Sequence, residues 1–232
     1  MPDATTVQEV LDRLTALDES LPATDGVKWF NKLYLEVTQN VASAVPDQPE
    51  ADPGFLAALD VYFGNRYFHA LDEAGDAALP HQYPFHAWKP LFEARFNKEI
   101  APVQFALAGM NAHINHDLAV GVCDTCAGRG ETPGDQQHKD YNSVNGLISK
   151  VEKGMKAWLM TGLLKEFDLA FNPMDDIVAV WDVERARDAA WVRAEVLWSL
   201  RDLPDLQEAY EATNDRTTEL ASRALLVPVG LR

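Results

Sequence analysis

Apolar residues recur along most of the chain at the three- and four-residue spacing of amphipathic helices. This spacing predicts helices over residues 6–21, 25–45, 54–74, 90–122, 140–171 and 183–200, and a final helix from Pro204 to about Leu226. Segments rich in proline or glycine separate them at residues 46–53, 75–88, 123–134 and 172–176. A short strand could form at residues 177–181, but nothing could pair with it. The pattern therefore predicts an all-α fold, with residues 1–232 forming a single-domain helical bundle of about eight helices around a buried central helix.

The predicted central helix, residues 90–122, departs from the amphipathic pattern. At about 100° per residue, His113, His116 and Asp117 fall within one arc of roughly 100°. Asn111 and Asn115 lie on nearly the opposite side, and apolar positions separate the two polar arcs. A helix on the protein surface has its polar residues on one side. Two polar faces predict a helix in the protein interior, where each polar group must be paired to offset its desolvation. We therefore expect the functional site on this helix.

Composition narrows the choice of partners. The 232 residues include 20 Lys and Arg against 36 Asp and Glu, which gives a formal net charge of −16. Surfaces that bind phosphate backbones need clustered basic residues, and anionic membranes repel an acidic protein. We therefore expect neither nucleic acid nor membrane as a partner. A small molecule or a metal ion is the expected partner.

Three further features predict a cytoplasmic protein. The first residues contain no basic segment followed by an apolar stretch, as a signal peptide would. The sequence has no uninterrupted run of 18 apolar residues that could span a membrane. With two cysteines and no export signal, the chain fits a reducing compartment.

The histidine arc suggests two kinds of chemistry. His113 and Asp117 are four residues apart, which places their Cβ atoms about 5–6 Å apart on one helix face and suits two ligands of one divalent metal. His116 could be a third ligand or a proton carrier, and His138 or Asp140 could complete the site. Histidine with carboxylate favours zinc, iron or manganese. The alternative is that Asp117 orients His113 in a buried hydrogen-bond network without a metal.

A second polar segment lies downstream of the central helix. Asp140 opens the helix predicted over residues 140–171, and its simplest role is to cap that helix. In a functional role Asp140 would face His113 and Asp117, with Asn145 one to two turns further along. Asn111, Asn115 and Asn145 would then contact substrate or orient the metal ligands.

Two other motifs, around Arg187 and Cys123, could carry a function. Arg187, one turn before Trp191, could bind an anionic group of a substrate, or it could form an ion pair with Glu184 or Asp188. Cys123 and Cys126 form a CxxC motif in the glycine-rich segment 123–134. A single CxxC is weak evidence for a zinc or redox site, and two free cysteines in a loop are the simpler interpretation.

Three segments together resemble a bacterial family classified as a domain of unknown function. They are an NAHINxDL segment at residues 111–118, a DxxxVN-like segment at residues 140–145 and an RxxAW segment at residues 187–191. The resemblance extends from about the third predicted helix to the helix of Trp191. It implies a soluble helical domain and no particular activity.

The residues support three functional hypotheses. The first is a metal-dependent enzyme acting on a small molecule, with hydrolase, lyase and oxygenase chemistry all open. The second is a metal-free acid–base enzyme, cyclase- or lyase-like, with a hydrophobic pocket lined by Trp158, Trp181 or Trp191. The third is a non-catalytic ligand-binding or interaction module in which the polar helix is a structural network.

Overall fold

The computed structural model describes residues 2–45, 51–75, 86–151, 153–154 and 182–228. Its helices are α1 (Val7–Ser20), α2 (Gly26–Ala44), α3 (Pro53–Gly75), α4 (Lys89–Ala94), α5 (Pro102–Ala112), a π-helical turn η2 (His113–Asp117), α6 (Leu118–Arg129), α7 (Asp135–Ser143), α10 (Val183–Ser199) and α11 (Pro204–Leu225). Residues 145–151 are also helical. These segments contain no strand, so the predicted all-α class is confirmed. The short strand considered at residues 177–181 lies outside the described residues.

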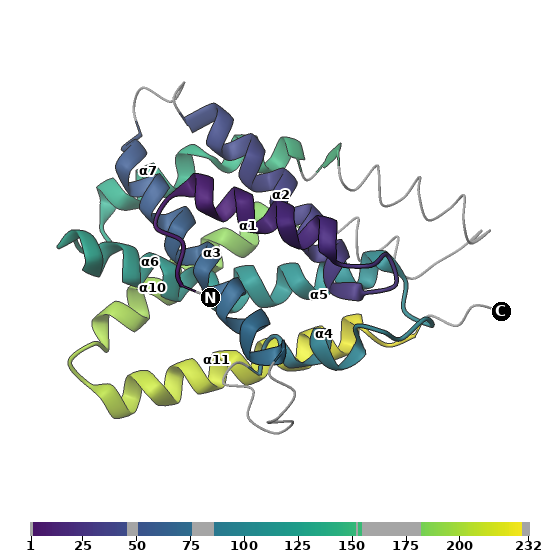
Figure 1. Cartoon of the computed structure of the whole chain (residues 1–232). Helices are drawn as coiled ribbons and strands as arrows, with labels where there is room; N and C mark the ends of the chain where they lie inside the picture. The colour runs from purple at the N-terminus through teal and green to yellow at the C-terminus, as the bar shows by residue number, and fades with distance from the viewer. Residues whose placement is uncertain (1, 46–50, 76–85, 152, 155–181, 229–232) are drawn as a thin grey trace.

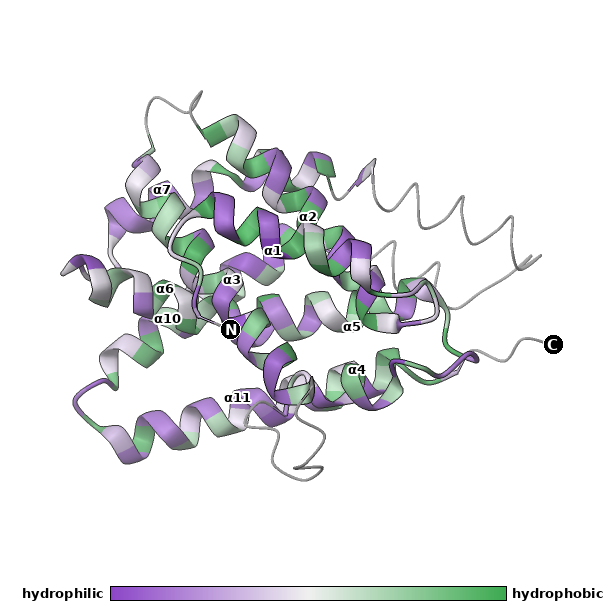
Figure 2. Ribbon diagram, in the orientation of Figure 1, coloured by the Kyte–Doolittle hydropathy of each residue, from purple (hydrophilic) through white to green (hydrophobic). Residues whose placement is uncertain are grey.

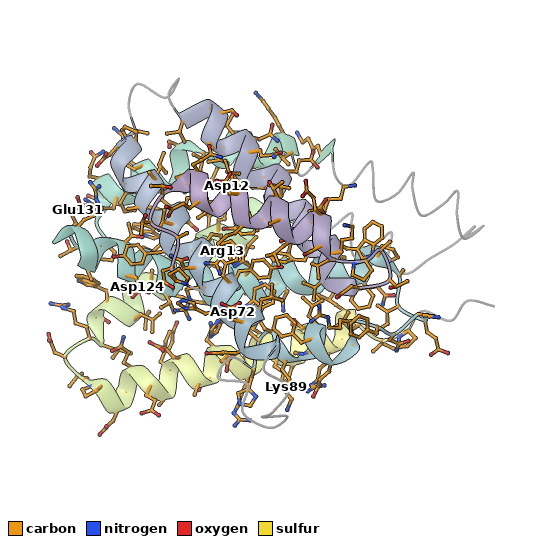
Figure 3. The ribbon with its side chains drawn as sticks, viewed as in Figure 1. Asp12, Arg13, Asp72, Lys89, Asp124 and Glu131 are labelled. Carbon is orange, nitrogen blue, oxygen red and sulfur yellow. The ribbon has the colours of Figure 1, made fainter. Side chains whose placement is uncertain are left out.

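Local sequence signals mark the starts of several helices. The side chains of Thr6 and Asp25 accept hydrogen bonds from backbone N–H groups in the first turns of α1 and α2. Proline occupies the first turn of α5 and of α11, where its missing N–H costs no helical hydrogen bond. An ion pair of 3.8 Å between Arg13 and Asp72 then ties α1 to α3 (Figure 3).

The central helix is shorter at its N-terminal end than the predicted range 90–122. Helix α4 ends at Ala94, and α5 begins at Pro102. Asn97 donates its backbone N–H to the Ala94 carbonyl in the intervening turn. The Arg95 guanidinium bonds to the Asp25 carboxylate that caps α2. These tertiary contacts, together with the proline, favour a break that periodicity did not reveal.

At its other end the central helix is longer than predicted. The CxxC segment, expected to be a loop, belongs to α6, which ends at Arg129. Its C-cap is Gly130, in the left-handed region at φ 68°, where glycine is favoured. Helix α7 then begins at Asp135, so Asp140 lies within it and does not open a helix. Burial of one face of α6 outweighs the low helix propensity of its glycines.

The run α5–η2–α6 lies in the middle of the protein, as predicted. In Figure 1, α5 is in the centre and α11 runs along the lower edge; in Figure 2, α11 is drawn mainly in hydrophilic and neutral colours. Helix α5 packs against α2 and α11, and α6 packs against α3 and α10. Apolar residues of α5 join one buried cluster, and those of η2 and α6 join another. His113 to Asp117 therefore lie where the two apolar clusters meet.

No helix within the described ranges is both long and apolar enough to cross a membrane.

Candidate functional site

The turn that carries the histidines is π-helical. In η2 the Leu118 N–H donates to the His113 carbonyl, an i→i+5 bond, whereas the flanking helices have ordinary α geometry. Single π turns inside α-helices are rare and frequently occur at functional sites. The sequence predicted an uninterrupted helix here, so this irregularity is a finding of the structure.

Asp117 is the centre of a buried polar cluster. Its carboxylate accepts hydrogen bonds from Trp88 Nε1 at 2.9 Å, His113 Nδ1 at 3.1 Å and His116 Nδ1 at 2.8 Å. The Arg66 Nε lies 3.6 Å from Asp117 Oδ1. We call these five residues the Asp117 cluster. The predicted convergence of His113, His116 and Asp117 on one region of the helix is therefore confirmed.

The Asp117 carboxylate is ionised at neutral pH. Burial favours its neutral form, but hydrogen bonds from His113 and His116, with the positive charge of Arg66, hold its pKa well below the usual range. An ionised carboxylate can only accept hydrogen bonds. Both imidazoles must therefore carry a proton on Nδ1.

His113 is buried among aromatic rings. Its imidazole stacks on Phe63 with a centroid separation of 3.5 Å, and it meets the edge of Tyr34 at 4.5 Å. Burial lowers the pKa of His113, and the hydrogen bond and charge of Asp117 oppose this lowering only in part. The imidazole is therefore neutral at pH 7, and its Nε2 is a bare acceptor. Within the described part of the chain, this buried nitrogen has no hydrogen-bond partner.

His116 links the Asp117 cluster to α11. Its Nε2 lies 3.6 Å from Asp215 Oδ1. The Asp215 carboxylate also accepts the backbone N–H groups of His86, at 2.9 Å, and Ala87, at 2.7 Å. The second nitrogen of His116 thus faces a carboxylate, whereas the second nitrogen of His113 does not. The two histidines have different environments and therefore different chemical uses.

A cavity of about 70 Å³ lies beside His113. Its wall is formed by residues of α2, α3, α5, η2, α6, α10 and the helical segment 145–151, and most are apolar, among them Phe30, Met110 and Ile148. Polar side chains in the wall are those of His113, Tyr34 and Arg187. We call this space the His113 cavity. An unpartnered imidazole in an apolar wall is suited to act on a small molecule.

A larger groove, of about 760 Å³, lies on the surface between the N-terminal segment and α3. Arg66 and Asp124 line it, and Figure 3 shows Asp124 on α6 near that segment. Arg66 separates the groove from buried Asp117 and lies 3.9 Å from Asp124. The polar groups that line the groove include His69 and Asp3, which are hydrogen-bonded to each other at 2.6 Å. We therefore regard the smaller cavity, with its unpartnered nitrogen, as the stronger candidate site.

The two predicted asparagines of the central helix form hydrogen bonds with neighbouring helices. Asn111 donates to the Thr218 carbonyl of α11 at 3.0 Å. Asn115 donates to Asn111 at 3.0 Å and accepts from Arg193 of α10 at 3.2 Å. Neither lines the His113 cavity. Their hydrogen bonds within the chain give them a structural role, and the opposite polar arc of the helix is thereby explained.

Asp140 and His138 do not join His113. Asp140 is buried, and its carboxylate accepts the Asp52 backbone N–H at 3.0 Å, just before α3. His138 stacks on Trp191 with centroids 4.5 Å apart. Trp191 is itself buried, donates to Glu195 at 2.9 Å and does not line the His113 cavity. The other two tryptophans proposed for a pocket, Trp158 and Trp181, lie outside the described residues.

Asn145 and Arg187 form a hydrogen-bonded pair, a contact that the sequence did not predict. The Arg187 Nε–H donates to Asn145 Oδ1 at 2.7 Å, and Arg187 lines the His113 cavity. The alternative ion pair of Arg187 with Glu184 or Asp188 does not form. Of the predicted substrate-binding residues, Arg187 is thus the one that shares a cavity with His113.

Of the predicted metal ligands, His113, His116 and Asp117 lie together and His138 lies elsewhere, against Trp191. Among the described residues, no three His, Cys, Asp or Glu side chains are grouped so that they could hold a metal ion. Both cysteines are free, and burial raises the pKa of Cys123 to about 12 and that of Cys126 to about 11. Thiols protonated at neutral pH are poor nucleophiles and metal ligands.

Sequence reasoning missed Trp88 and Phe63 beside His113, and Asp215 beside His116. Trp88 belongs to a segment predicted to be a loop, and Asp215 is one of many acidic residues in a polar helix. Phe63 follows the apolar pattern of α3 like any core residue. Nothing in the sequence marks these positions, because each acts through a tertiary contact.

The fold and the site together define an all-α protein organised around a buried aspartate that binds two histidines of a π-helical turn. The chain belongs to a family of unknown function (DUF5995), whose model matches residues 7–228, and the predicted resemblance to such a family is confirmed. Neither a curated protein nor a solved structure matches the chain.

Proposed function

We propose that the protein is a metal-free acid–base enzyme that acts on a small molecule bound in the His113 cavity. The observation that carries this proposal is the buried His113 imidazole, with Nδ1 bonded to Asp117 and Nε2 unpartnered. A carboxylate that fixes the tautomer of a histidine and stabilises its protonated form is the arrangement used in general acid–base catalysis. Asp117 thus has the orienting role and His113 the catalytic role.

The supported chemistry is a proton transfer. His113 Nε2 would take a proton from a C–H or O–H group, while the bonding electron pair stays on the substrate. The Asp117 carboxylate would stabilise the imidazolium that forms. Return of the proton to another atom completes an isomerisation, and loss of a leaving group completes an elimination. The apolar wall favours a substrate with an apolar body and excludes water from the reacting atoms.

Deuterium exchange tests the catalytic role directly. A panel of small apolar carbonyl compounds would be incubated with the protein in D₂O, and the loss of C–H signals followed by NMR. We expect exchange with the wild type and a loss of at least about 100-fold in His113→Gln. His138→Gln is the matched control, because His138 lies against Trp191. Equal exchange in wild type and His113→Gln would contradict the proposal.

A second measurement needs no substrate. Nitrogen-15 NMR of the imidazoles should show His113 neutral at pH 7, with its proton on Nδ1 and none on Nε2. An imidazolium, or a proton on Nε2, would leave no free base and would overturn the assignment.

The metal-dependent alternative has His113 and Asp117 as ligands of zinc, iron or manganese, helped by His116, His138 or Asp140. Both oxygens of Asp117 already accept hydrogen bonds, which a metal would have to displace. Elemental analysis of the protein without a histidine tag, beside His113→Ala, tests it. Near-stoichiometric metal that is lost in the variant, or exchange activity abolished by a chelator, would favour this alternative.

The remaining proposals concern the non-catalytic alternative, the cellular compartment and the class of partner. A non-catalytic binding module would show no exchange activity, and His113→Ala would lower its melting temperature strongly. We place the protein in the cytoplasm, in keeping with its two free thiols. The net charge of −16 supports a small-molecule partner and neither nucleic acid nor an anionic membrane.

A further inference from the structure

Arg187 is a buried cation held by neutral groups. Only 6% of the Arg187 surface is exposed to solvent. The Nε–H donates to Asn145 Oδ1 and an Nη2 hydrogen to the Tyr141 carbonyl, both at 2.7 Å. The guanidinium also stacks on the Tyr141 ring, 4.0 Å from its centroid. These contacts fix the position and plane of the guanidinium without neutralising its charge.

Two other partly buried arginines of this acidic protein form ion pairs with carboxylates. Arg95 forms an ion pair with Asp25, and Arg129 forms ion pairs with Asp52 and Glu131. Within the segments that the structure describes, no carboxylate forms an ion pair with Arg187. An unpaired buried charge is costly, because neutral dipoles replace water only in part. The chain has 36 acidic residues. A buried arginine that, among the described residues, is held only by neutral partners therefore indicates that its counter-ion is a ligand.

The position of Arg187 indicates where that ligand would bind. Arg187 and His113 line the same cavity, whose other walls are mostly apolar. A molecule bound there would meet a fixed guanidinium, an unpartnered imidazole nitrogen and apolar side chains. A carboxylate fits this set better than a phosphate, because its two oxygens match a planar guanidinium and a single cation balances its single charge.

We infer that the substrate of the proposed acid–base site is a small apolar carboxylic acid, whose carboxylate binds Arg187. This inference rests on the proposed function for the role of His113, but the binding of the carboxylate can be measured by itself. Asn145 and Tyr141 act as positioning residues for the guanidinium.

The test compares butyrate with its uncharged isostere butyramide, and with inorganic phosphate, at constant ionic strength. Binding is followed by titration with NMR detection of the methyl signals of Met110 and Ile148, which line the cavity and are present in every variant. We expect butyrate to bind the wild type at least about tenfold more tightly than butyramide, and more tightly than phosphate. Equal affinity for acid and amide, or no binding of either, would overturn the inference. Stronger binding of phosphate would show that the anion class is wrong.

Variants test whether Arg187 is the residue that binds the carboxylate. Arg187→Gln should lose the preference for butyrate over butyramide, and Arg187→Lys should retain part of it. Arg185→Gln, on the same helix with a side chain 87% exposed, is the matched control and should behave as the wild type. Arg187→Gln that is folded and keeps the preference would contradict the inference; if it does not fold, the wild-type comparison of acid and amide decides.

His113→Gln separates this inference from the proposed function. If both hold, this variant binds butyrate with its preference intact and catalyses no exchange. A wild type that prefers butyrate but catalyses no exchange would refute the acid–base role and leave the carboxylate site standing. Exchange activity without a preference for butyrate would refute the carboxylate site alone.

Discussion

Phe63 and His113 lie face to face, with ring centroids 3.5 Å apart and planes inclined by 10°. Phe63 belongs to α3 and His113 to η2, so this contact joins the two helical segments at the candidate site. The stack covers one face of the imidazole, and the hydrogen bond to Asp117 fixes its rotation. Together they hold His113 in one orientation beside the cavity.

Removing this stack should loosen the imidazole. In Phe63→Leu the aromatic contact is lost while most of the apolar volume remains, so we expect a decrease of about 1–2 kcal/mol in the free energy of unfolding. Urea titration measures it. Phe96→Leu, at a position 64% exposed, is the control and should change the stability by less than about 0.5 kcal/mol. Equal losses in the two variants would show that the stack has no special energetic role.

Asp117→Asn should destabilise the protein by about 2–4 kcal/mol, because an amide has one acceptor oxygen where the carboxylate accepts from three side chains. The pKa of Asp117 is lower in the folded protein than in the unfolded chain. Its stabilisation is therefore present above about pH 4 and is lost as the pH falls below that value. Unfolding measured from pH 3 to 7 should show a weaker acid dependence in the variant. The exposed Asp12→Asn control should retain the wild-type slope.

Asp60 should have the opposite pH dependence. Burial raises its pKa to about 7, and its Oδ2 has no hydrogen-bond partner within the described residues. The folded state then holds a proton that the unfolded chain releases near pH 4, so stability is full below about pH 4 and is lost as the pH rises to about 7. Asp60→Asn should therefore raise the melting temperature at pH 8 and change it little at pH 4. Asp202→Asn, with a side chain 85% exposed, should change neither. A variant less stable at pH 8 would contradict the prediction.

Gly109 permits the close approach of α5 to α2. A Cβ atom at this position would lie 2.4 Å from the Phe30 ring, which itself meets His113 at a centroid distance of 5.5 Å. We expect Gly109→Ala to cost about 1–3 kcal/mol by overpacking and to shift the His113 NMR signals. Gly146 is also helical, but no described residue lies within 4 Å of such a Cβ atom, so Gly146→Ala should instead stabilise the protein by about 0.5–1 kcal/mol. Thermal unfolding measures whether Gly109→Ala lowers the stability and Gly146→Ala raises it.

The sequence by itself determined the helical class, most helix positions and the helix that carries the polar cluster. These properties depend on local periodicity and on residues within one or two turns, as for His113 and Asp117. The tertiary structure alone decided which of the predicted residues share a site. It brought Arg187 to His113 and held Asn111, His138 and Asp140 in other contacts.

The same distinction explains the errors at the helix ends and the missed partners. The helix through Cys123 and Cys126 is stabilised by burial of its face against α3 and α10, which outweighs local propensity. Trp88 bonds to Asp117 from a position 29 residues earlier in the chain. Asp215 lies beside His116 but belongs to α11, which is distant in the sequence. A one-dimensional pattern shows which face of a helix is buried. It does not show which other helix covers that face, because this depends on packing that all the helices satisfy together.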